Sequence, residues 1–369
     1  FKECASAGQV AEAVAMGVRR AAPDAEVVCV PMADGGEGTV DALVMATSGT
    51  LVERRVMGPM GESVLAAYGI LGDGGTAVIE MAAASGLALV SPTERDPRTA
   101  TTRGTGELMR DALDRGVCRM ILGIGGSATN DGGAGMAQAL GYSLRDARGE
   151  ELGPGGAALA DLAVIDDTRR HPGLAACEVL VACDVDNPLC GPTGASLIYG
   201  PQKGATPPVA CALDEALRYF GETVEAQLGK AILDLPGSGA AGGLGGGLVA
   251  FCGAKLVSGV ELVAEACGLA RHVAGADLVI TGEGALDRQT ASGKTPVGVA
   301  RVAKAYGVPV VALAGKLGAD YRVVYDHGID AAFSVVPGPE TLDYAVEHAL
   351  AYLADTAEAV MRLWLMARR

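Results

Sequence analysis

The sequence predicts an α/β protein built as two α/β domains. Short apolar runs rich in Val and Ile alternate with segments of helical period, a pattern typical of buried, largely parallel strands connected by helices. The 369 residues are enough for two domains, each with a core of ordinary size. Glycine is in clear excess, with 54 of 369 residues, roughly twice the usual share. Its clusters mark loops where the backbone turns with positive φ or approaches a ligand.

The apolar and periodic segments predict the elements in chain order. Strands are expected at residues 26–32, 76–82, 119–125, 178–185, 276–282 and 308–315, and helices at 8–21, 105–115, 133–140, 209–229, 294–306 and 341–366. The segment ERRVMGPMGE within residues 49–75 predicts β-hairpins at a sheet edge, with a domain boundary near residue 50. The glycine-rich segment 230–258 is interpreted as a linker or a binding loop.

Charge and composition limit the partners. With a formal net charge of −15 and a pI near 4.7, the chain is not expected to bind nucleic acid, and an anionic ligand would need a local basic site. No apolar run approaches the length of about 18 residues that a membrane span needs, and the first residues do not form a signal peptide. Nine scattered cysteines without a CxxC pair favour free thiols over disulfides or a zinc site. We therefore expect a cytoplasmic protein that does not bind membranes.

The loop within ILGIGGSATNDGGAGMAQALG, residues 121–141, follows a predicted strand and has three interpretations. It fits G-x-G-x-x-A, a variant of the dinucleotide-binding motif, although its helix begins too late for that motif. An ordinary glycine-rich turn, with Asp131 as the helix N-cap, is the second. We favour an anion site, because backbone N–H groups and a helix N-terminus attract phosphate or carboxylate. Its candidate residues are Gly125, Gly126, Ser127, Thr129, Asn130 and Asp131, the last as an Mg²⁺ ligand or proton acceptor.

A second glycine loop, PMADGGEGTVDAL at residues 31–43, follows another predicted strand. It carries Asp34 and Glu37 beside three glycines. Open α/β sheets place their binding sites at the carboxyl ends of strands, so the two carboxylates are candidates for a metal or for a substrate hydroxyl. An ordinary acidic turn near a helix start is the alternative.

A third loop, residues 182–205, follows the strand predicted at 178–185. Asp184 and Asp186 would point to opposite faces of an extended segment, so they do not both serve one site. Asp184 is the candidate base for an acceptor hydroxyl, with a turn aspartate as the alternative. Asn187 is a candidate substrate contact, and Lys203, within GPQKGA, is a candidate charge partner for phosphate.

A fourth loop, TGEGALDRQTASGKTPVGVA at residues 281–300, contains SGKT but is not a P-loop, because Arg288 stands where that motif requires glycine. Pro296 is typical of a helix start just after these residues. The loop can hold a cation and an anion together, through Glu283, Asp287, Gln289 and Lys294.

Four strand-to-loop segments thus carry Asp or Glu with glycines, and two of them contain lysines. Phosphoryl transfer needs such groups: carboxylates for Mg²⁺, backbone N–H and Lys for phosphate oxygens, and an Asp that orients or deprotonates the acceptor hydroxyl. The residues therefore predict a phosphotransferase without naming its acceptor.

Together the motifs closely resemble the type-1 bacterial glycerate kinases. The matching segments, in order from residue 1 to about 315, are FKE, PMADGGEGT, GIGGSATNDGGAGMAQALG, CDVDNPLCGPTGAS, GPQKGA, GAAGGLGGGL and TGEGALDRQTASGKTPVGVA. The resemblance implies phosphorylation of D-glycerate by ATP with Mg²⁺, in glyoxylate or sugar-acid catabolism. It also implies a flavodoxin-like (Rossmann-like) three-layer domain of residues 1–50 plus 270–369 and an inserted mixed α/β domain of residues 51–269, with the active site in a cleft. Family members usually begin with a short strand before the FK pair, so we expect that strand to lie outside this sequence.

The roles of single residues are hypotheses. Asp184 is the candidate base, Asp131 and Glu283 are candidate Mg²⁺ or phosphate-site carboxylates, and the candidate charge partners are Lys2, Lys203 and Lys294. The 2-hydroxyl of glycerate is favoured over the 3-hydroxyl as acceptor, although both oxygens lie within about 3 Å of each other. The alternatives are a kinase of another small hydroxy or sugar acid, a non-catalytic sensor and a dehydrogenase. A homodimer is the candidate assembly.

Overall fold

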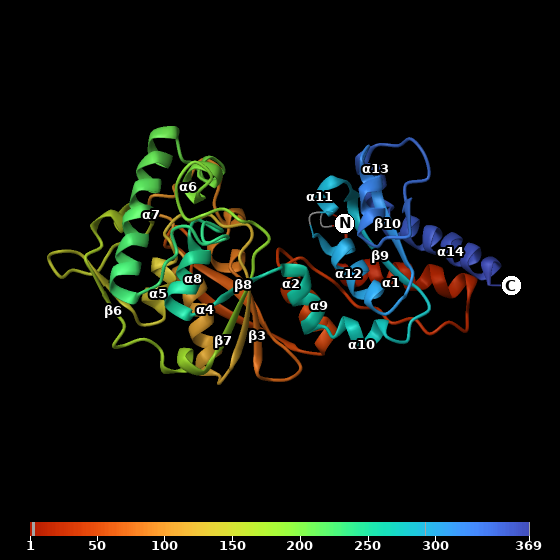
Figure 1. Ribbon diagram of the computed structural model, residues 1–369, viewed down its shortest axis with the longest axis horizontal. Helices are drawn as coiled ribbons and strands as arrows, with labels where there is room; N and C mark the ends of the chain where they lie inside the picture. The colour runs from red at the N-terminus through yellow and green to blue at the C-terminus, as the bar shows by residue number, and fades with distance from the viewer. Residues whose placement is uncertain (2–3, 292, 369) are drawn as a thin grey trace. The chain divides into compact units, whose positions relative to one another are not determined.

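The computed structural model describes residues 1, 4–291 and 293–368, and it confirms an α/β fold (Figure 1). Its contacts divide the chain into two compact units. Unit 1 comprises Phe1–Asp34, Asp41–Ala46 and Val260–Arg369, and unit 2 comprises Gly35–Val40 and Thr47–Gly259. The domain bounds inferred from the sequence, 1–50 plus 270–369 and 51–269, stay a prediction.

Unit 2 is built on a six-stranded sheet in the order β1-β2-β3-β4-β7-β8. β1 (Thr50–Met57) and β2 (Ser63–Ile70) form an antiparallel hairpin at the sheet edge, which confirms the hairpin predicted within residues 49–75. β2 also pairs antiparallel with β3 (Thr76–Glu80). β3, β4 (Arg119–Gly123), β7 (Glu178–Ala182) and β8 (Lys255–Val257) are parallel. The carboxyl ends of these four strands therefore lie at one edge of the sheet.

Helices and a large apolar core complete unit 2. The helices are α3 (Ala82–Ser85), α4 (Arg103–Asp114), α5 (Ala134–Ala139), α6 (Ala195–Tyr199), α7 (Pro207–Leu228) and α8 (Leu244–Cys252). A separate hairpin pairs β5 (Ser143–Arg145) with β6 (Val164–Asp166), and short 3-10 turns cover Leu87–Leu89, Gly156–Asp161, Pro172–Ala176 and Pro201–Lys203. Ile79, Leu122 and Val181 of the parallel strands have no exposed surface. Strands buried on both faces appear in a sequence as continuous apolar runs, which is why they could be predicted.

The interpretation of residues 230–258 as a linker or binding loop is wrong for its second half, where α8 and β8 form. α8 contains three consecutive glycines because neighbouring backbone lies directly against them. A Cβ on Gly247 would lie 2.2 Å from the carbonyl oxygen of Gly132, and one on Gly245 would lie 2.4 Å from that of Gly237. Close packing thus outweighs the poor helix propensity of glycine.

Unit 1 contains a three-stranded parallel sheet in the order β11-β10-β9. The strands are β9 (Val279–Leu286), β10 (Val310–Leu317) and β11 (Ala331–Ser334). Val311 and Leu313 of β10 face a core shared with α1 (Ala7–Ala21) and α14 (Ala349–Ala367). α12 (Thr295–Ala305) packs against β9 and β10 as well. Because side chains alternate along a strand, the buried Val310 and Ala312 face away from the α1–α14 side, so helices cover both faces of the sheet.

The remaining helices are short. They are α2 (Thr39–Thr47), α9 (Gly259–Ala266), α10 (Leu269–Val273), α11 (Arg288–Ala291) and α13 (Leu342–Glu347), with a 3-10 turn at Tyr321–His327. The helix predicted at 341–366 is interrupted at His348, where α13 ends before α14 begins. Among the described residues we find no helix whose length and apolar content would let it span a bilayer.

The strand predicted at residues 26–32 does not form. This segment has no regular secondary structure, although Val27 packs against the core of unit 1. A strand requires a hydrogen-bonded neighbour, and none of the described strands pairs with this segment. Its apolar character therefore reflects burial of single side chains and not a sheet ladder.

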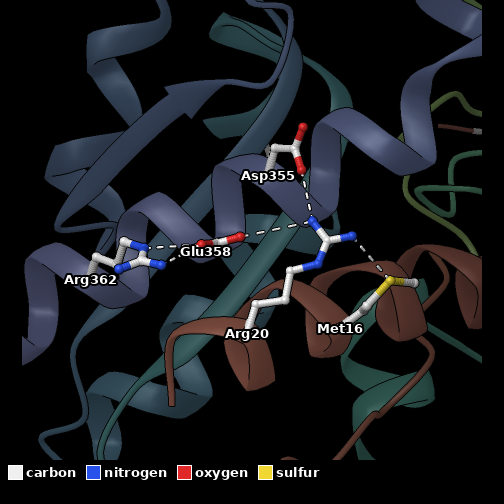
Figure 2. Close-up of polar contacts among 5 residues, drawn as sticks. All are labelled: Met16, Arg20, Asp355, Glu358 and Arg362. Carbon is white, nitrogen blue, oxygen red and sulfur yellow. Dashed lines mark hydrogen bonds and ion pairs between the residues drawn. The ribbon is translucent and has the colours of Figure 1, made fainter. Parts of the chain in front are cut away.

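α1 and α14 are also joined by a small polar network (Figure 2). Arg20 of α1 donates from Nη1 to Asp355 Oδ1 at 2.8 Å and lies 3.8 Å from Glu358 Oε2. Glu358 in turn accepts from Arg362, four residues further along α14. Because Arg20, Asp355 and Arg362 are exposed and Glu358 is only partly buried, the network contributes about 1 kcal/mol or less, and the apolar contact between the helices dominates.

Candidate active site

The glycine turn Gly35–Gly36 lies against the carboxyl ends of two neighbouring strands of unit 2. A Cβ on Gly35, whose φ is +85°, would lie 2.2 Å from the Cβ of Ala182, the last residue of β7. A Cβ on Gly123, the last residue of β4, would lie 2.3 Å from the carbonyl oxygen of Gly35. Only glycine allows these backbones to approach so closely. The turn with Glu37, the loop after β4 and the segment after β7 therefore meet at one edge of the sheet, where parallel sheets place their binding sites.

The loop after β4 has an exposed beginning and a buried end. Gly125 and Gly126 are exposed, and Gly126 has a φ of +72°. Backbone hydrogen bonds tie the loop to the segment after β3, since Leu87 N donates to Gly126 O at 2.8 Å. Ser127 is 7% exposed, and Thr129 and Asn130 are wholly buried. Within this loop, the two glycines are thus the residues that present backbone to a ligand.

Asp131 is buried, and both of its carboxylate oxygens accept hydrogen bonds. Oδ2 accepts from N and Oγ1 of Thr102, at 2.8 and 2.9 Å, and from N of Gly135 at 3.3 Å. Oδ1 accepts from N of Gly133 at 3.1 Å. Burial raises the pKa of this carboxyl group above its usual range. The contacts resemble those of a helix cap that joins the starts of α4 and α5, and they favour a structural role over metal binding.

Lys203 is a buried residue whose side chain contacts the same loop. Its side chain is 1% exposed, and Nζ donates to the carbonyl oxygen of Thr129 at 2.6 Å. Burial lowers the pKa of Lys203 to about 7, while the nearby charge of Asp131 acts in the opposite direction. Lys203 therefore stabilises the loop by a hydrogen bond from the protein interior. Its burial does not favour the predicted role of an exposed charge partner for phosphate.

Two buried oxygens of the loop have no hydrogen-bond partner within the described structure. They are Oγ1 of Thr129 and Oδ1 of Asn130. The amide nitrogen of Asn130, in contrast, donates to Oγ of Ser196 at 2.9 Å. Unpaired buried polar atoms are uncommon and are typical of positions that a water molecule or a ligand completes.

Asp184 lies just after β7 and is exposed. Its Oδ1 accepts a hydrogen bond from the backbone N of Gly259 at 3.0 Å, which fixes the orientation of the carboxylate. Asn187 is engaged within the same loop, since Nδ2 donates to Thr193 O at 2.7 Å and Oδ1 accepts from Tyr199 OH at 2.6 Å. Asp184 is therefore an exposed carboxylate with a fixed orientation, whereas both polar atoms of the Asn187 amide serve the loop itself.

Carboxylates also lie in and beside the glycine turn. Glu37 is exposed, and Asp34, in the adjoining segment of unit 1, is partly buried. Glu80, the last residue of β3, was not identified from the sequence; its Oε1 accepts from the backbone N of Val40 at 2.8 Å. The available signal was its position, because Glu80 ends a buried strand just as Asp184 follows one.

The candidate residues of the fourth loop form a second group, in unit 1. Oε1 of Glu283, in β9, accepts from the hydroxyl of the buried Thr290. Asp287 Oδ1 accepts from the backbone N of Gln289 at 2.8 Å and of Thr290 at 3.3 Å, which starts α11. Burial raises the pKa of Glu283, Asp287 adds to this effect and Lys294 opposes it.

Lys294 connects this group to the start of α12. It is the N-cap residue of that helix, with Pro296 in the first turn as predicted. Its Nζ donates to Oε1 of Gln289 at 3.3 Å. A cation and the N-terminus of an 11-residue helix thus lie beside two carboxylates, an arrangement that suits a phosphate group and its counter-ion.

The structure places the candidates in these two groups. Gly125, Gly126, Ser127, Asp184 and Glu37 lie at the strand ends of unit 2, with Asp131 and Lys203 buried under the loop. Glu283, Asp287, Gln289 and Lys294 lie together in unit 1. Lys2 lies outside the described residues. In the part of the chain that the structure describes, no group of three or more His, Cys, Asp or Glu is arranged to hold a metal ion by itself.

Comparison with known proteins identifies relatives along almost the whole chain. The sequence pattern of the glycerate kinase family matches residues 1–365. A glycerate kinase of Halalkalibacterium halodurans is 53% identical over 99% of this chain and 96% of its own length. A glycerate 2-kinase of Escherichia coli is 53% identical over 94% of this chain and 91% of its own length.

A solved structure is similar as well. The crystal structure assigned to glycerate kinase 2 of Salmonella typhimurium LT2 superimposes with a TM-score of 0.93, at 50% sequence identity, and the match covers 100% of this chain and 96% of that one. The similarity thus extends from the sequence motifs to the complete fold.

Proposed function

The chain belongs to the glycerate kinase family, and we propose that it transfers the γ-phosphoryl group of ATP to the 2-hydroxyl group of D-glycerate. Relatives named as glycerate kinases are 51–53% identical to it over nearly its full length, which supports a kinase that acts on glycerate. The observation that carries the choice of the 2-hydroxyl is the 53% identity to a glycerate 2-kinase. In the reaction, the bond from the γ-phosphorus to the bridging oxygen breaks, and the glycerate oxygen forms the new bond.

We assign Asp184 as the group that orients the acceptor hydroxyl and takes its proton. Its carboxylate is exposed at the end of β7, and the hydrogen bond from Gly259 holds it in one orientation. A carboxylate at this position lowers the cost of proton loss as the phosphorus–oxygen bond forms. Glu37 in the neighbouring glycine turn supplies a further exposed carboxylate.

We assign the loop after β4 to the carboxylate of glycerate. Gly125 and Gly126 are exposed, Ser127 adds a hydroxyl group next to them, and Oγ1 of Thr129 and Oδ1 of Asn130 have no hydrogen-bond partner within the described residues. Backbone N–H groups in such a turn bind anions well. Asp131 and Lys203 act through this loop, by hydrogen bonds that hold it, and not by contact with substrate.

We assign the group in unit 1 to the phosphates of ATP. Lys294 and the N-terminus of α12 supply positive charge, and Gln289 orients Lys294. Mg²⁺ in kinases is held by one or two carboxylates together with the phosphates, so a site without three protein carboxylates fits this ion. Glu283 and Asp287 are the residues that would hold it, and the ion would neutralise charge on the phosphates. Lys2 stays a proposed further charge partner.

The setting of the enzyme is part of the same proposal. All nine cysteines are free thiols, which supports a reducing compartment, and we propose the cytoplasm. The strongly acidic chain supports small-molecule partners over nucleic acid. We propose a homodimer that works in glyoxylate or sugar-acid catabolism, since that is the setting that the motif resemblance implies.

Substrate analogues test the acceptor directly. ADP release would be measured with D-glycerate, with D-lactate, which has only the 2-hydroxyl, and with 3-hydroxypropanoate, which has only the 3-hydroxyl. We expect D-glycerate to be the best substrate and D-lactate to be phosphorylated slowly, with no turnover of 3-hydroxypropanoate. Turnover of another hydroxy acid without turnover of glycerate would support a kinase but would contradict glycerate as its substrate. The reverse preference between the two analogues would contradict transfer to the 2-hydroxyl.

A further inference from the structure

A cavity of about 660 Å³ lies in unit 2, among residues that the proposed function does not use. Its volume is in the range of about 300–1,000 Å³ that small-molecule sites occupy. Arg103 and Arg110 of α4 and Arg169, from the segment after β6, line it together with the apolar side chains of Met57, Leu152 and Pro154.

The three arginines are an unusual concentration of positive charge in this chain, which has a net charge of −15. Arg110 and Arg169 are exposed, and neither has a carboxylate within ion-pair distance in the part of the chain that is described. Arg169 acts on Asp166 only at longer range. Arg103 lies 3.4 Å from Glu107, one turn further along α4, so its guanidinium is partly compensated. Arg110 and Arg169 thus bring to this cavity two positive charges that no described carboxylate compensates within ion-pair distance, against one lining carboxylate, that of Glu151.

The other polar groups that line the cavity already have partners within the protein. The carboxylate of Glu151 accepts from Oγ of Ser143 and from the backbone N of Leu144. The amide of Gln138 donates to Leu152 O at 3.0 Å, and the hydroxyl of Tyr142 donates to a backbone carbonyl oxygen of α8 at 2.6 Å. Among the described residues, the guanidinium groups of Arg110 and Arg169 are thus the groups of this cavity that meet solvent without a hydrogen-bond partner in the protein.

We propose that this cavity is a second anion site, which binds a small organic phosphate apart from the site of phosphoryl transfer. Guanidinium groups form paired hydrogen bonds with phosphate oxygens and remain charged at any physiological pH. Met57, Leu152 and Pro154 provide apolar surface for the carbon part of such a ligand. Inorganic phosphate lacks that part and binds the same arginines more weakly.

Calorimetric titration of the full chain with 3-phosphoglycerate tests the proposal. The double variant Arg110→Gln/Arg169→Gln is expected to lose a binding event that wild type shows, with an affinity loss of about tenfold or more for each arginine. The matched control Arg19→Gln/Arg322→Gln removes two exposed arginines outside the cavity and is expected to bind as wild type does. The kcat with D-glycerate should be the same in all three proteins, which shows that each is folded. Identical titrations for wild type and the cavity variant would overturn the proposal.

Two further measurements need only the wild-type protein. 3-Phosphoglycerate should slow the modification of Arg110 and Arg169 by phenylglyoxal, followed by peptide mass spectrometry, without slowing that of Arg19. Titration with inorganic phosphate should show weaker binding than 3-phosphoglycerate. Modification of the two arginines at an unchanged rate would refute the site, and equal affinity for the two ligands would refute a ligand with a carbon part. Neither readout depends on which acid the enzyme phosphorylates.

Discussion

Asp184 and Asp186 follow β7 at a spacing that allows a direct test of the proposed base. Both are exposed, but only Asp184 is held by Gly259. Asp184→Asn keeps an oxygen that can accept this hydrogen bond and removes the proton acceptor. We expect kcat to fall by about 10²–10⁴ with little change in the KM for ATP. Steady-state kinetics with Asp186→Asn as control would show this difference, and an Asp184→Asn enzyme with near-normal kcat would refute the assignment.

Lys203 should affect how stability depends on pH. The pKa of the buried side chain is about 7 in the folded protein, against about 10.4 in an unfolded chain. The unfolded state therefore binds more protons between these values, so this group makes the free energy of unfolding rise as pH increases from 7. Lys203→Met removes that contribution. Urea unfolding would be measured at pH 7.0 and 8.5. Between these values the free energy of unfolding of the wild type should rise by up to about 2 kcal/mol more than that of the variant. Equal increases in both proteins would show that Lys203 is not buried as described.

Glu283 is expected to oppose stability while it serves the reaction. Burial raises its pKa, so the charged form is disfavoured in the folded state. This cost is present at neutral pH and disappears as pH falls below the unfolded value of about 4.3, because the group is then protonated in both states. Glu283→Gln should therefore raise the melting temperature at pH 7, by less at pH 4, and should lower kcat. A Glu283→Gln protein that is less stable than wild type at pH 7 would contradict the cost of burial. A protein with unchanged kcat would contradict the role of Glu283 in the reaction.

At the scale of elements, the contact between α8 and the turn before α5 is the most sensitive packing feature of the candidate site. A Cβ on Gly247 would lie 2.2 Å from the carbonyl oxygen of Gly132, which precedes α5. Because both atoms belong to the backbone, Gly247→Ala should cost about 3 kcal/mol of stability. Gly153→Ala is the matched control, since a Cβ there meets nothing within 4 Å. Urea unfolding should separate the two variants clearly, and equal stability would show that α8 is not packed in this way.

The elements show where sequence patterns succeed and where they fail. β3, β4, β7, β9 and β10 were predicted because each lies in or begins within an apolar run, which is typical of strands in a parallel sheet. α8 was missed because its glycines suggest a loop, whereas they are required by backbone packed against the helix, for Gly247 by the turn at Gly132, more than a hundred residues earlier. The strand expected at residues 26–32 was wrong for a related reason, because pairing depends on a neighbour that a local pattern does not contain.

At the scale of the whole molecule, the sequence located the loops of the candidate site but not the environment of each side chain. Glycines with carboxylates after apolar runs marked the segments around Asp184 and Glu283, because strand ends are recognisable locally. The burial of Asp131 and Lys203 could not be predicted, since it depends on α4, α5 and the Pro201–Lys203 turn packing around one loop. Burial changes the proposed role of both residues from contact with substrate to support of the loop.

The net charge of the whole chain leads to a further expectation. With a net charge of −15, the protein repels polyanions. The arginine-lined cavity is a local exception, and its volume suits a small ligand. We expect no shift of a DNA fragment in gel electrophoresis at physiological salt and no retention on heparin. Retention that decreases with added salt would indicate a polyanion site and would contradict the restriction to small-molecule partners.

The position of the phosphoryl group on the product tests transfer to the 2-hydroxyl of glycerate. Purified protein would be incubated with ATP, Mg²⁺ and D-glycerate, and the product examined by proton-coupled ³¹P NMR. Transfer to the 2-hydroxyl places phosphorus beside a CH group, so we expect a doublet, together with one ADP released for each product formed. A triplet, from phosphorus beside a CH₂ group, would show transfer to the 3-hydroxyl and contradict the proposed reaction, as would the absence of any phosphorylated glycerate.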